Sequence, residues 1–301
     1  MSGKDQTLAV VIPCHNEADN IVKLVEAIGD IRKQIEGEAG LSLLFVDDGS
    51  TDDTIEVIRK QSGDHPWINW LSFSRNFGKE AALYAGLLNS TDKDYIAVMD
   101  ADFQDPPEMI AEMIGILDEH REYDCVGSFR TTRKGEPVVR SFFANAFYRI
   151  INKVSGIELK NGARDFRIMR KDMVEAILSM AERNRFSKGL FEWVGFNTYW
   201  LPYENIERQS GKTSWSFMKL VAYSISGIIN FSSVPLALIS IMGLICTFLS
   251  FVFLLVVNNQ EVVGRYRCHT RLDLHGMYHN APGRYPAFVA GNYRTVYFPD
   301  I

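Results

Sequence analysis

The stretch Val98-Met99-Asp100-Ala101-Asp102-Phe103-Gln104-Asp105-Pro106-Pro107-Glu108 shows how the chain is organised. The apolar residues 95–99 predict a buried strand, and the two prolines end it before an amphipathic helix that Glu108 opens. In an extended segment residues two apart point to one side, so Asp100, Asp102 and Gln104 would present three oxygens together. Such oxygens suit Mg²⁺ or Mn²⁺, although a polar strand end that caps the next helix would show the same spacing.

Short apolar runs alternate with helical patterns through the N-terminal part of the chain. Strands are expected at 8–12, 41–46, 67–73 and 95–99, and a fifth ends at 125–128. This alternation predicts an α/β fold, a mainly parallel central sheet with helices on both faces. Ligands of such sheets bind outside the carboxyl ends of the strands. Four expected strands end in polar pairs, which predicts an active site there: Asn16/Glu17, Asp47/Asp48, Arg75/Asn76 and Asp100/Asp102. Further along, helices are expected at 136–155 and 172–181, and strands after 161 and at 191–200 and 203–208.

Composition and charge fit a large intracellular fold. The 301 residues are 47% hydrophobic, and the four cysteines are scattered, which favours a reducing compartment over a disulfide framework or a zinc site. The N-terminus lacks the order of a signal peptide. The net charge of −5 conceals an acidic segment 1–120, with a net charge of −14, and a basic segment 121–220, with +7. One half could hold a metal and the other anions, although both could equally be solvated faces.

The region after residue 214 predicts attachment to a membrane. No charged residue occurs between 220 and 257, and residues 236–257 are long enough to cross a bilayer. The preceding residues predict an amphipathic helix in the membrane interface. We therefore expect a catalytic domain at 1–214, a juxtamembrane helix at 215–234, a transmembrane helix at 235–257 and an atypical polar tail at 258–301. The tail shows no sustained helical or alternating period and is assigned no fold.

Taken in order, the motifs resemble those of the family-2 inverting glycosyltransferases of the GT-A fold. Within that family the chain is similar to the polyprenyl-phosphate sugar transferases, which include dolichol-phosphate mannose synthases and bacterial bactoprenol glucosyltransferases. Each motif alone is weak, and the ordered set is specific. The motifs are VIP at 11–13 with Asn16-Glu17, VDDGSTD at 46–52, RNFGK at 75–79, DADFQDPPE at 100–108, RDFR at 164–167, and Arg208 with GKTS at 211–214.

The resemblance implies a role for particular residues. It implies a nucleotide-sugar site formed by Pro13, Asn16, Glu17, Asp47, Asp48, Lys79, Asp100 and Lys212. It implies Mg²⁺ or Mn²⁺ on Asp100, Asp102 and Gln104, and catalytic roles for Asp102, Asp165 and Arg208. The acceptor phosphate would meet Arg130, Arg133 and Lys134. Alternatives remain open: Asp47 only caps its turn, Arg208 and the 130–134 cations are ordinary surface charges, and Asp165 orients Arg164 or Arg167 instead of acting as a base.

The implied reaction moves a hexose, preferably glucose from UDP-glucose, to undecaprenyl phosphate with inversion, giving a β-linked lipid for polysaccharide modification. The partners would be a nucleotide sugar, a polyprenyl phosphate, the bilayer and other copies of the chain, such as a tetramer, with no nucleic acid. The enzyme would lie in the bacterial inner membrane with its catalytic domain on the cytoplasmic side. The donor could instead be GDP-mannose, UDP-N-acetylglucosamine or a UDP-aminopentose.

Other classes fit the sequence less well. A processive synthase would carry a Gln-x-x-Arg-Trp motif, which is missing, and a dinucleotide oxidoreductase needs a glycine-rich turn where residues 12–15 read Ile-Pro-Cys-His. A catalytically impaired membrane scaffold stays open, because a second apolar span, usual in the bactoprenol branch, is replaced by the polar tail. That change suggests a truncation or a change of reading frame near Glu261.

Overall fold

The computed structural model describes residues 6–35, 40–131, 147–180, 182, 185–204 and 225–276, with side chains as far as residue 259. Four of the expected site residues, Arg133, Lys134, Arg208 and Lys212, lie outside these ranges, as do the first half of the expected juxtamembrane helix and the segment 277–301. The chain divides into a compact unit that ends at Ala237 and a second unit from Leu238 onward.

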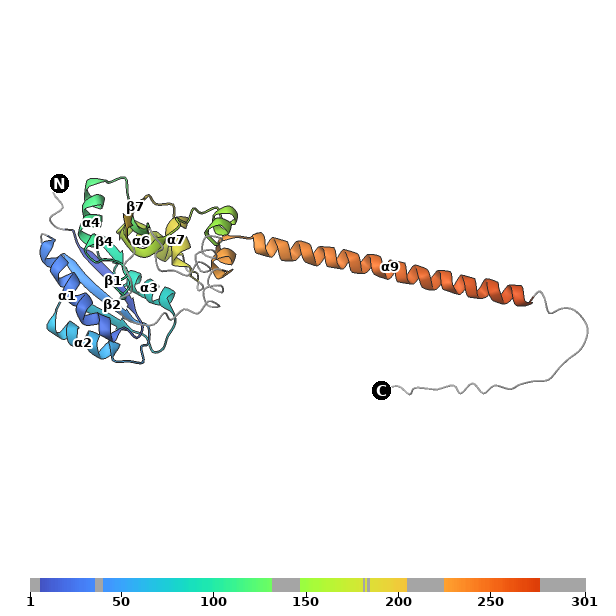
Figure 1. The fold of residues 1–301 in the computed structure, drawn as a ribbon, viewed down its shortest axis with the longest axis horizontal. Coiled ribbons are helices and arrows are strands. Elements are labelled where there is room, and N and C mark those ends of the chain that lie inside the picture. The colour runs from blue at the N-terminus through green and yellow to red at the C-terminus, as the bar shows by residue number, and fades with distance from the viewer. Residues whose placement is uncertain are drawn as a thin grey trace, which may run out of the picture. The chain divides into compact units, whose positions relative to one another are not determined.

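The first unit is built around a mixed sheet whose described strands run in the order β3-β2-β1-β4-β6-β5-β7 (Figure 1). Strands β1 to β4 are mutually parallel, and β5 pairs in parallel with β7, whereas β6 runs antiparallel to both of its neighbours. The expected α/β fold with a mainly parallel sheet is therefore confirmed. The elements of this unit are β1 Leu8–Cys14, α1 Ala18–Gln34, β2 Leu41–Asp47, α2 Thr54–Asp64, β3 Ile68–Ser72, α3 Lys79–Leu88, β4 Tyr95–Val98, α4 Met109–Glu119, β5 Cys125–Arg130, β6 Ala163–Arg170, α6 Lys171–Ser179, α7 Ser187–Trp193 and β7 Thr198–Tyr203.

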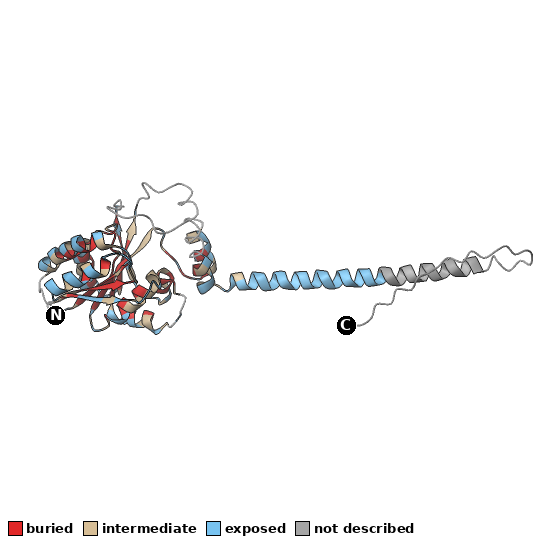
Figure 2. Ribbon diagram, turned by 90° about the horizontal axis from the view of Figure 1, so that it is seen from below, coloured by how far each residue is buried: buried red, intermediate tan, exposed pale blue. Residues whose placement is uncertain are grey.

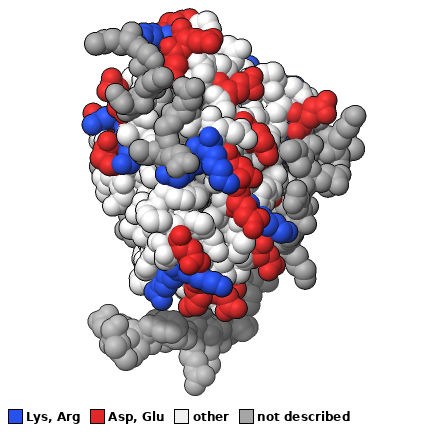
Figure 3. Space-filling model, turned by 90° about the vertical axis from the view of Figure 1, so that its left-hand side faces the viewer, with Lys and Arg blue, Asp and Glu red and all other residues white. Residues whose placement is uncertain are grey.

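Both faces of the sheet are buried beneath helices, as the unbroken apolar strands require. Val10 and Ile12 of β1 pack with α1 and α4 in one core, and the intervening Val11 packs with α3 and α6 in the other. Figure 2 shows the strands as the most deeply buried part of the unit. Acidic and basic side chains lie beside one another on the face shown in Figure 3. On that face the two signs are not separated into distinct patches.

The expected strand at 191–200 is wrong in its first part. Residues 191–193 end helix α7, and strand β7 begins only at Thr198 and runs to Tyr203. The other expected strand, 203–208, lies mostly outside the described residues. Aromatic residues favour strands, but Leu190 and Phe191 are buried together, which a helical turn against the core permits. Gly189 allows the close approach, because a Cβ there would meet the Phe231 ring at 2.4 Å.

Helix α9 runs from Val234 to Gly276 and forms the described part of the second unit from Leu238 onward. Its residues Val234–Asn259 are apolar enough to cross a membrane, and the most apolar 18-residue window within them is 0% buried. The helix passes the expected end at 257 and includes the first part of the tail to which the sequence assigned no fold. No proline interrupts the sequence between Pro235 and Pro282. Adding residues to an existing helix costs little, so the helix can continue where apolar periodicity has ended.

Candidate active site

The polar pairs predicted at the strand ends are brought together by the parallel order of β1, β2 and β4. The loop after β2 touches the loop after β1, because the His15 Nδ1 lies 3.0 Å from the Asp48 carbonyl oxygen. Asn16 has a positive φ of 57°, and its Oδ1 accepts the Thr51 amide at 2.8 Å. The Glu17 amide donates to Thr54 Oγ1 at 2.9 Å. Pro13 lies on β1 opposite Val46. The first two motifs therefore form one connected edge.

The two aspartates that end β2 both hold neighbouring loops. Asp47 accepts the Ser50 amide at 3.0 Å and the Ser72 hydroxyl at 2.8 Å, so it caps the turn and fixes the end of β3. Asp48 is buried and accepts the amides of Phe77 and Gly78 at 2.7 and 2.9 Å. These bonds set the path of the loop that enters α3. A contact of either carboxylate with a nucleotide stays a prediction.

Gly49 makes this arrangement possible. Its φ is +63°, a region that suits glycine. A Cβ at this position would lie 2.4 Å from the Arg75 carbonyl carbon. The turn after Asp48 therefore reaches the Arg75–Asn76 backbone only because residue 49 has no side chain.

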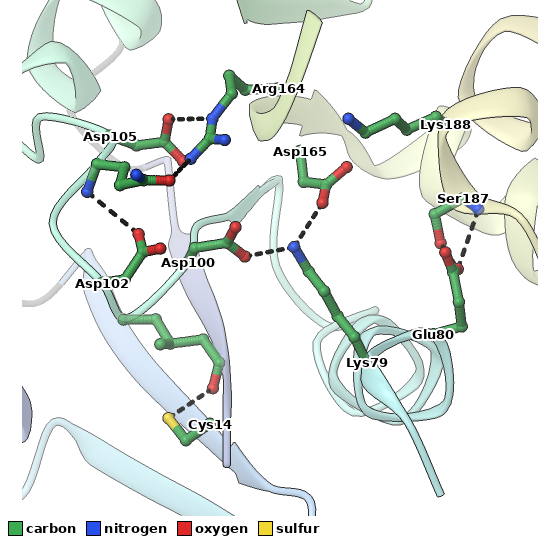
Figure 4. Close-up of polar contacts among 12 residues, drawn as sticks. Cys14, Lys79, Glu80, Asp100, Asp102, Asp105, Arg164, Asp165, Ser187 and Lys188 are labelled. Atoms are coloured by element: carbon green, nitrogen blue, oxygen red, sulfur yellow. Dashed lines mark hydrogen bonds and ion pairs between the residues drawn. The ribbon is translucent and has the colours of Figure 1, made fainter. Parts of the chain in front are cut away.

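The Asp100–Asp105 segment is a turn, and the expectation that it continues as an extended strand is wrong. Strand β4 ends at Val98, and Phe103 has a φ of +55°. Asp102 Oδ1 accepts the Gln104 amide at 3.1 Å, which closes the turn. The alternation of an extended chain therefore does not apply, and Asp100, Asp102 and Gln104 are oriented by separate contacts (Figure 4).

Lys79 lies between two of the predicted site carboxylates, although it is distant from both of them in the sequence. Its Nζ lies 2.6 Å from Asp100 Oδ1 and 2.5 Å from Asp165 Oδ2 (Figure 4). Burial alone would lower the pKa of Lys79, but the charges of Asp100 and Asp165 outweigh it and raise that pKa. Burial would likewise raise the pKa of Asp165, whereas Lys79 and then Lys188 hold it well below its usual range. Lys79 and Asp165 are therefore both charged at neutral pH.

A second ion pair holds the Asp100–Asp105 turn against β6 and β7. The fully buried Asp105 carboxylate accepts Arg164 Nε at 3.0 Å and the Tyr203 hydroxyl at 2.7 Å through the same Oδ1 atom. Arg164 Nη2 donates to Gln104 Oε1 at 3.1 Å. Sequence reasoning missed Asp105 and Tyr203. The position of Asp105 directly before two prolines could have indicated its structural role, whereas nothing in the local sequence pointed to Tyr203.

The remaining cations of β5 and β6 differ in their surroundings. Arg130 ends β5 opposite Tyr203. Burial and the charge of Asp105 raise the pKa of the Tyr203 hydroxyl, and the charge of Arg130 opposes that rise. Arg167 is 1% exposed, lies 3.9 Å from the Phe191 ring centre, and donates to the Arg164 carbonyl at 3.2 Å. The ion pairs also show which cation each carboxylate contacts. Asp165 pairs with Lys79, whereas Arg164 pairs with Asp105.

The divalent cation that the resemblance implies can be tested against these donors. Asp100 and Asp102 offer hard carboxylate oxygens, and Asp100 already holds a cation, the Lys79 ammonium. Gln104 Oε1 is engaged by Arg164. Within the described ranges no group of three or more His, Cys, Asp or Glu side chains could enclose a metal. Mg²⁺ typically uses one or two carboxylates and takes its other ligands from water and phosphate. The two aspartates fit that incomplete ligand set.

Comparison with known proteins identifies relatives along most of the chain. Residues 9–178 match the model of glycosyl transferase family 2. The Bacillus subtilis glycosyltransferase CsbB is 37% identical over 84% of this chain and 75% of its own. The prophage bactoprenol glucosyl transferase homolog of Escherichia coli K12 is 34% identical over 82% of this chain and 79% of its own. Bactoprenol glucosyl transferase of Shigella phage SfX is 33% identical over similar shares, 82% and 79%.

A solved structure, glucosyl-3-phosphoglycerate synthase from Mycobacterium tuberculosis with Mn²⁺, UDP-glucose and glycerol 3-phosphate, is similar with a TM-score of 0.49. It is 20% identical and covers 76% of this chain and 80% of its own. The family model covers residues 9–178, and relatives of the same family match most of the chain. The order of the strands in the sheet is consistent with this assignment. The chain belongs to glycosyl transferase family 2, with a GT-A-like fold.

Proposed function

We propose that the protein transfers a hexose from a nucleotide sugar to a polyprenyl phosphate at a membrane. The single observation that carries the proposal is the pairing, on one chain, of a family-2 fold with a 26-residue apolar helix whose most apolar window is not buried at all. Apolar surface of that extent is stable only when a non-aqueous environment covers it. An acceptor with a polyprenyl tail is found in that same environment. The relatives named bactoprenol glucosyl transferase support this acceptor.

In this proposal the nucleotide sugar binds at the carboxyl ends of strands β1, β2 and β4. Asn16 and Glu17 border the edge where the nucleoside would bind, and the Asp100–Asp102 turn lies where its diphosphate would arrive. Asp100 and Asp102 would hold Mg²⁺ or Mn²⁺ there. The cation would supply positive charge to the departing diphosphate. Glucose from UDP-glucose is our preferred donor, by resemblance to the relatives.

Asp165 would act in positioning, not as a strong base. A phosphate monoester is ionised at neutral pH, and Lys79 and Lys188 keep Asp165 ionised. One acceptor phosphate oxygen would attack the anomeric carbon as the bond to the nucleoside diphosphate breaks, which inverts that centre. Arg130, at the end of β5, would meet the acceptor phosphate, with Arg133 and Lys134 beyond the described part of the chain. Arg208 and Lys212 would contact the diphosphate.

The proposal also places the protein in the cell. Val234–Asn259 would cross the bacterial inner membrane and keep the catalytic unit on the cytoplasmic side, where nucleotide sugars occur. Association into a homo-oligomer is part of the same proposal and rests on resemblance alone.

The test is sugar transfer by the full chain in detergent. Radiolabelled UDP-glucose, UDP-N-acetylglucosamine, a UDP-aminopentose and GDP-mannose are offered with undecaprenyl phosphate, with Mg²⁺, with Mn²⁺ and with EDTA. We expect metal-dependent labelling of the lipid from one donor, with loss of activity in Asp102→Ala. Anomeric configuration of the product by NMR checks inversion. Failure of a folded, metal-supplied protein to label the lipid from any donor would refute the proposal and favour the impaired scaffold.

A further inference from the structure

The Lys79 ammonium occupies a place that the proposed reaction needs for another cation. It contacts Asp100 at 2.6 Å and Asp165 at 2.5 Å, through carboxylates that come from the end of β4 and from β6. Lys79 is the first residue of α3, so its backbone is fixed by the helix while its side chain can turn. The lysine side chain is 32% exposed and that of Asp100 is 23% exposed, so water and ions can reach this pair.

Lys79 is one of several cations near these carboxylates, but among the described residues it is the one that contacts Asp100. Its ammonium makes direct ion pairs with Asp100 and Asp165 (Figure 4). Lys188 and Arg167 also act on Asp165, so Asp165 has cations near it besides Lys79. A divalent cation that binds the same oxygen of Asp100 must therefore replace the Lys79 ammonium there.

We propose that Lys79 is a built-in counter-cation that competes with the divalent cation for Asp100 and remains on Asp165 once it has been displaced. The inference rests on the proposed function only in taking Asp100 as a ligand of that cation. Before the donor arrives, the ammonium keeps Asp100 and Asp165 in place. When the cation takes Asp100, Lys79 keeps one partner, so Asp165 retains its charge and its orientation. Lys79 is thus a positioning residue that links the occupation of the donor site to the carboxylate on β6.

Competition has a measurable consequence that does not involve sugar transfer. Removing the ammonium removes a competitor, so a divalent cation should bind Asp100 more tightly. Loss of a hydrogen-bonded, partly exposed ion pair with Asp100 should change the dissociation constant of the divalent cation by about tenfold. The opposite result, weaker binding, is expected if Lys79 instead helps to build the cation site.

The experiment is a titration of the full chain in detergent with Mn²⁺ alone, followed by the EPR signal of free Mn²⁺, and repeated with UDP present. We expect Lys79→Met and Lys79→Gln to bind Mn²⁺ about tenfold more tightly than the wild type. Lys79→Arg keeps the charge and should stay close to the wild type. Two neutral variants are used so that misfolding of one does not decide the result, and circular dichroism checks both.

Lys188→Met is the matched control, because Lys188 also acts electrostatically on Asp165 but donates to the Ala163 carbonyl at 3.2 Å. Its affinity for Mn²⁺ should change less than twofold, since it does not occupy Asp100. Equal or weaker Mn²⁺ binding by folded Lys79→Met and Lys79→Gln, or equal tightening by Lys188→Met, would overturn the inference. Tight binding by the Lys79 variants together with no lipid labelling by the wild type would instead refute the proposed function alone.

Discussion

The Tyr203→Phe substitution tests whether the buried Asp105 carboxylate stabilises the fold through its two donors. The Tyr203 hydroxyl donates to Asp105 Oδ1 at 2.7 Å, and Arg164 Nε donates to the same atom at 3.0 Å. The Asp105 side chain is 0% exposed and Tyr203 is 8% exposed. Water therefore cannot readily replace the lost hydroxyl, and the substitution changes no other heavy atom.

The expected loss follows from the charge of the acceptor. A hydrogen bond to a charged group contributes about 1.5 to 3 kcal/mol, so we expect Tyr203→Phe to lower the free energy of unfolding by about 2 kcal/mol. For a unit of this size that corresponds to a fall in Tm of about 4 to 8 °C. Arg164→Met should cost more, about 3 to 5 kcal/mol, because it leaves a buried carboxylate without its cation.

The assay is thermal unfolding of the full chain in detergent, followed by intrinsic fluorescence and far-UV circular dichroism. Tyr199→Phe is the control: it lies on the same strand, is 36% exposed, and packs its ring edge-on against Tyr123. Its Tm should change by less than about 2 °C. If Tyr203→Phe behaves like Tyr199→Phe, or costs more than Arg164→Met, the ion pair is not what stabilises this corner.

Three further predictions concern other parts of the first unit. Gly86→Ala should destabilise it by about 1 to 3 kcal/mol in urea unfolding, because the new Cβ would meet Val11 Cγ1 at 2.2 Å; an unchanged midpoint would contradict this. Burial would raise the pKa of Asp165 but Lys79 holds it low, so the ion pair stabilises the fold above about pH 4 and is lost as the pH falls further. Asp165→Asn should therefore flatten the fall of Tm between about pH 4 and pH 2, and an unaltered slope would show that another carboxylate causes it. Burial raises the pKa of Cys125 to about 11, so maleimide should label this thiol at neutral pH only after unfolding, and rapid labelling of the native protein would argue against its burial.

The strands were predictable because their local signal agrees with their environment. The runs at 8–12 and 41–46 are apolar at nearly every position, and the structure covers both faces of β1 and β2. The direction of β6 was not predictable in the same way, since periodicity carries no information on whether a strand runs parallel to its neighbour. The helix at α7 was missed because its packing involves residues far away in the sequence, such as Phe231, whose ring lies beside Gly189.

The same distinction between local signals and long-range contacts applies to the candidate site. Parallel strand order is a property of the fold, so the prediction that polar strand ends meet was correct for the pairs at β1 and β2, which the structure joins through Asn16 and Thr51. Pairing between side chains is a different matter. Lys79 and Asp165 are 86 residues apart and Tyr203 and Asp105 are 98 apart, and no local pattern ranks such partners. The turn at Phe103 was also hidden, because a non-glycine residue with positive φ is uncommon.

Helix α9 is longer than the hydrocarbon core of a bilayer is thick. At 1.5 Å per residue its 43 residues span about 65 Å, whereas the hydrocarbon core of a bilayer is about 30 Å thick. The apolar part, Val234–Asn259, accounts for about 39 Å, which fills the core with some tilt. The part of the helix beyond it therefore belongs outside the core. That part carries Arg265, Arg267 and Arg271, which oppose a position across the membrane from the cytoplasm under the positive-inside rule. In our proposal the family-2 unit at the other end of the span also lies in the cytoplasm. A helix that crosses the membrane once puts its two ends on opposite sides, so a single span would place these three arginines across the membrane from the family-2 unit, against the positive-inside rule.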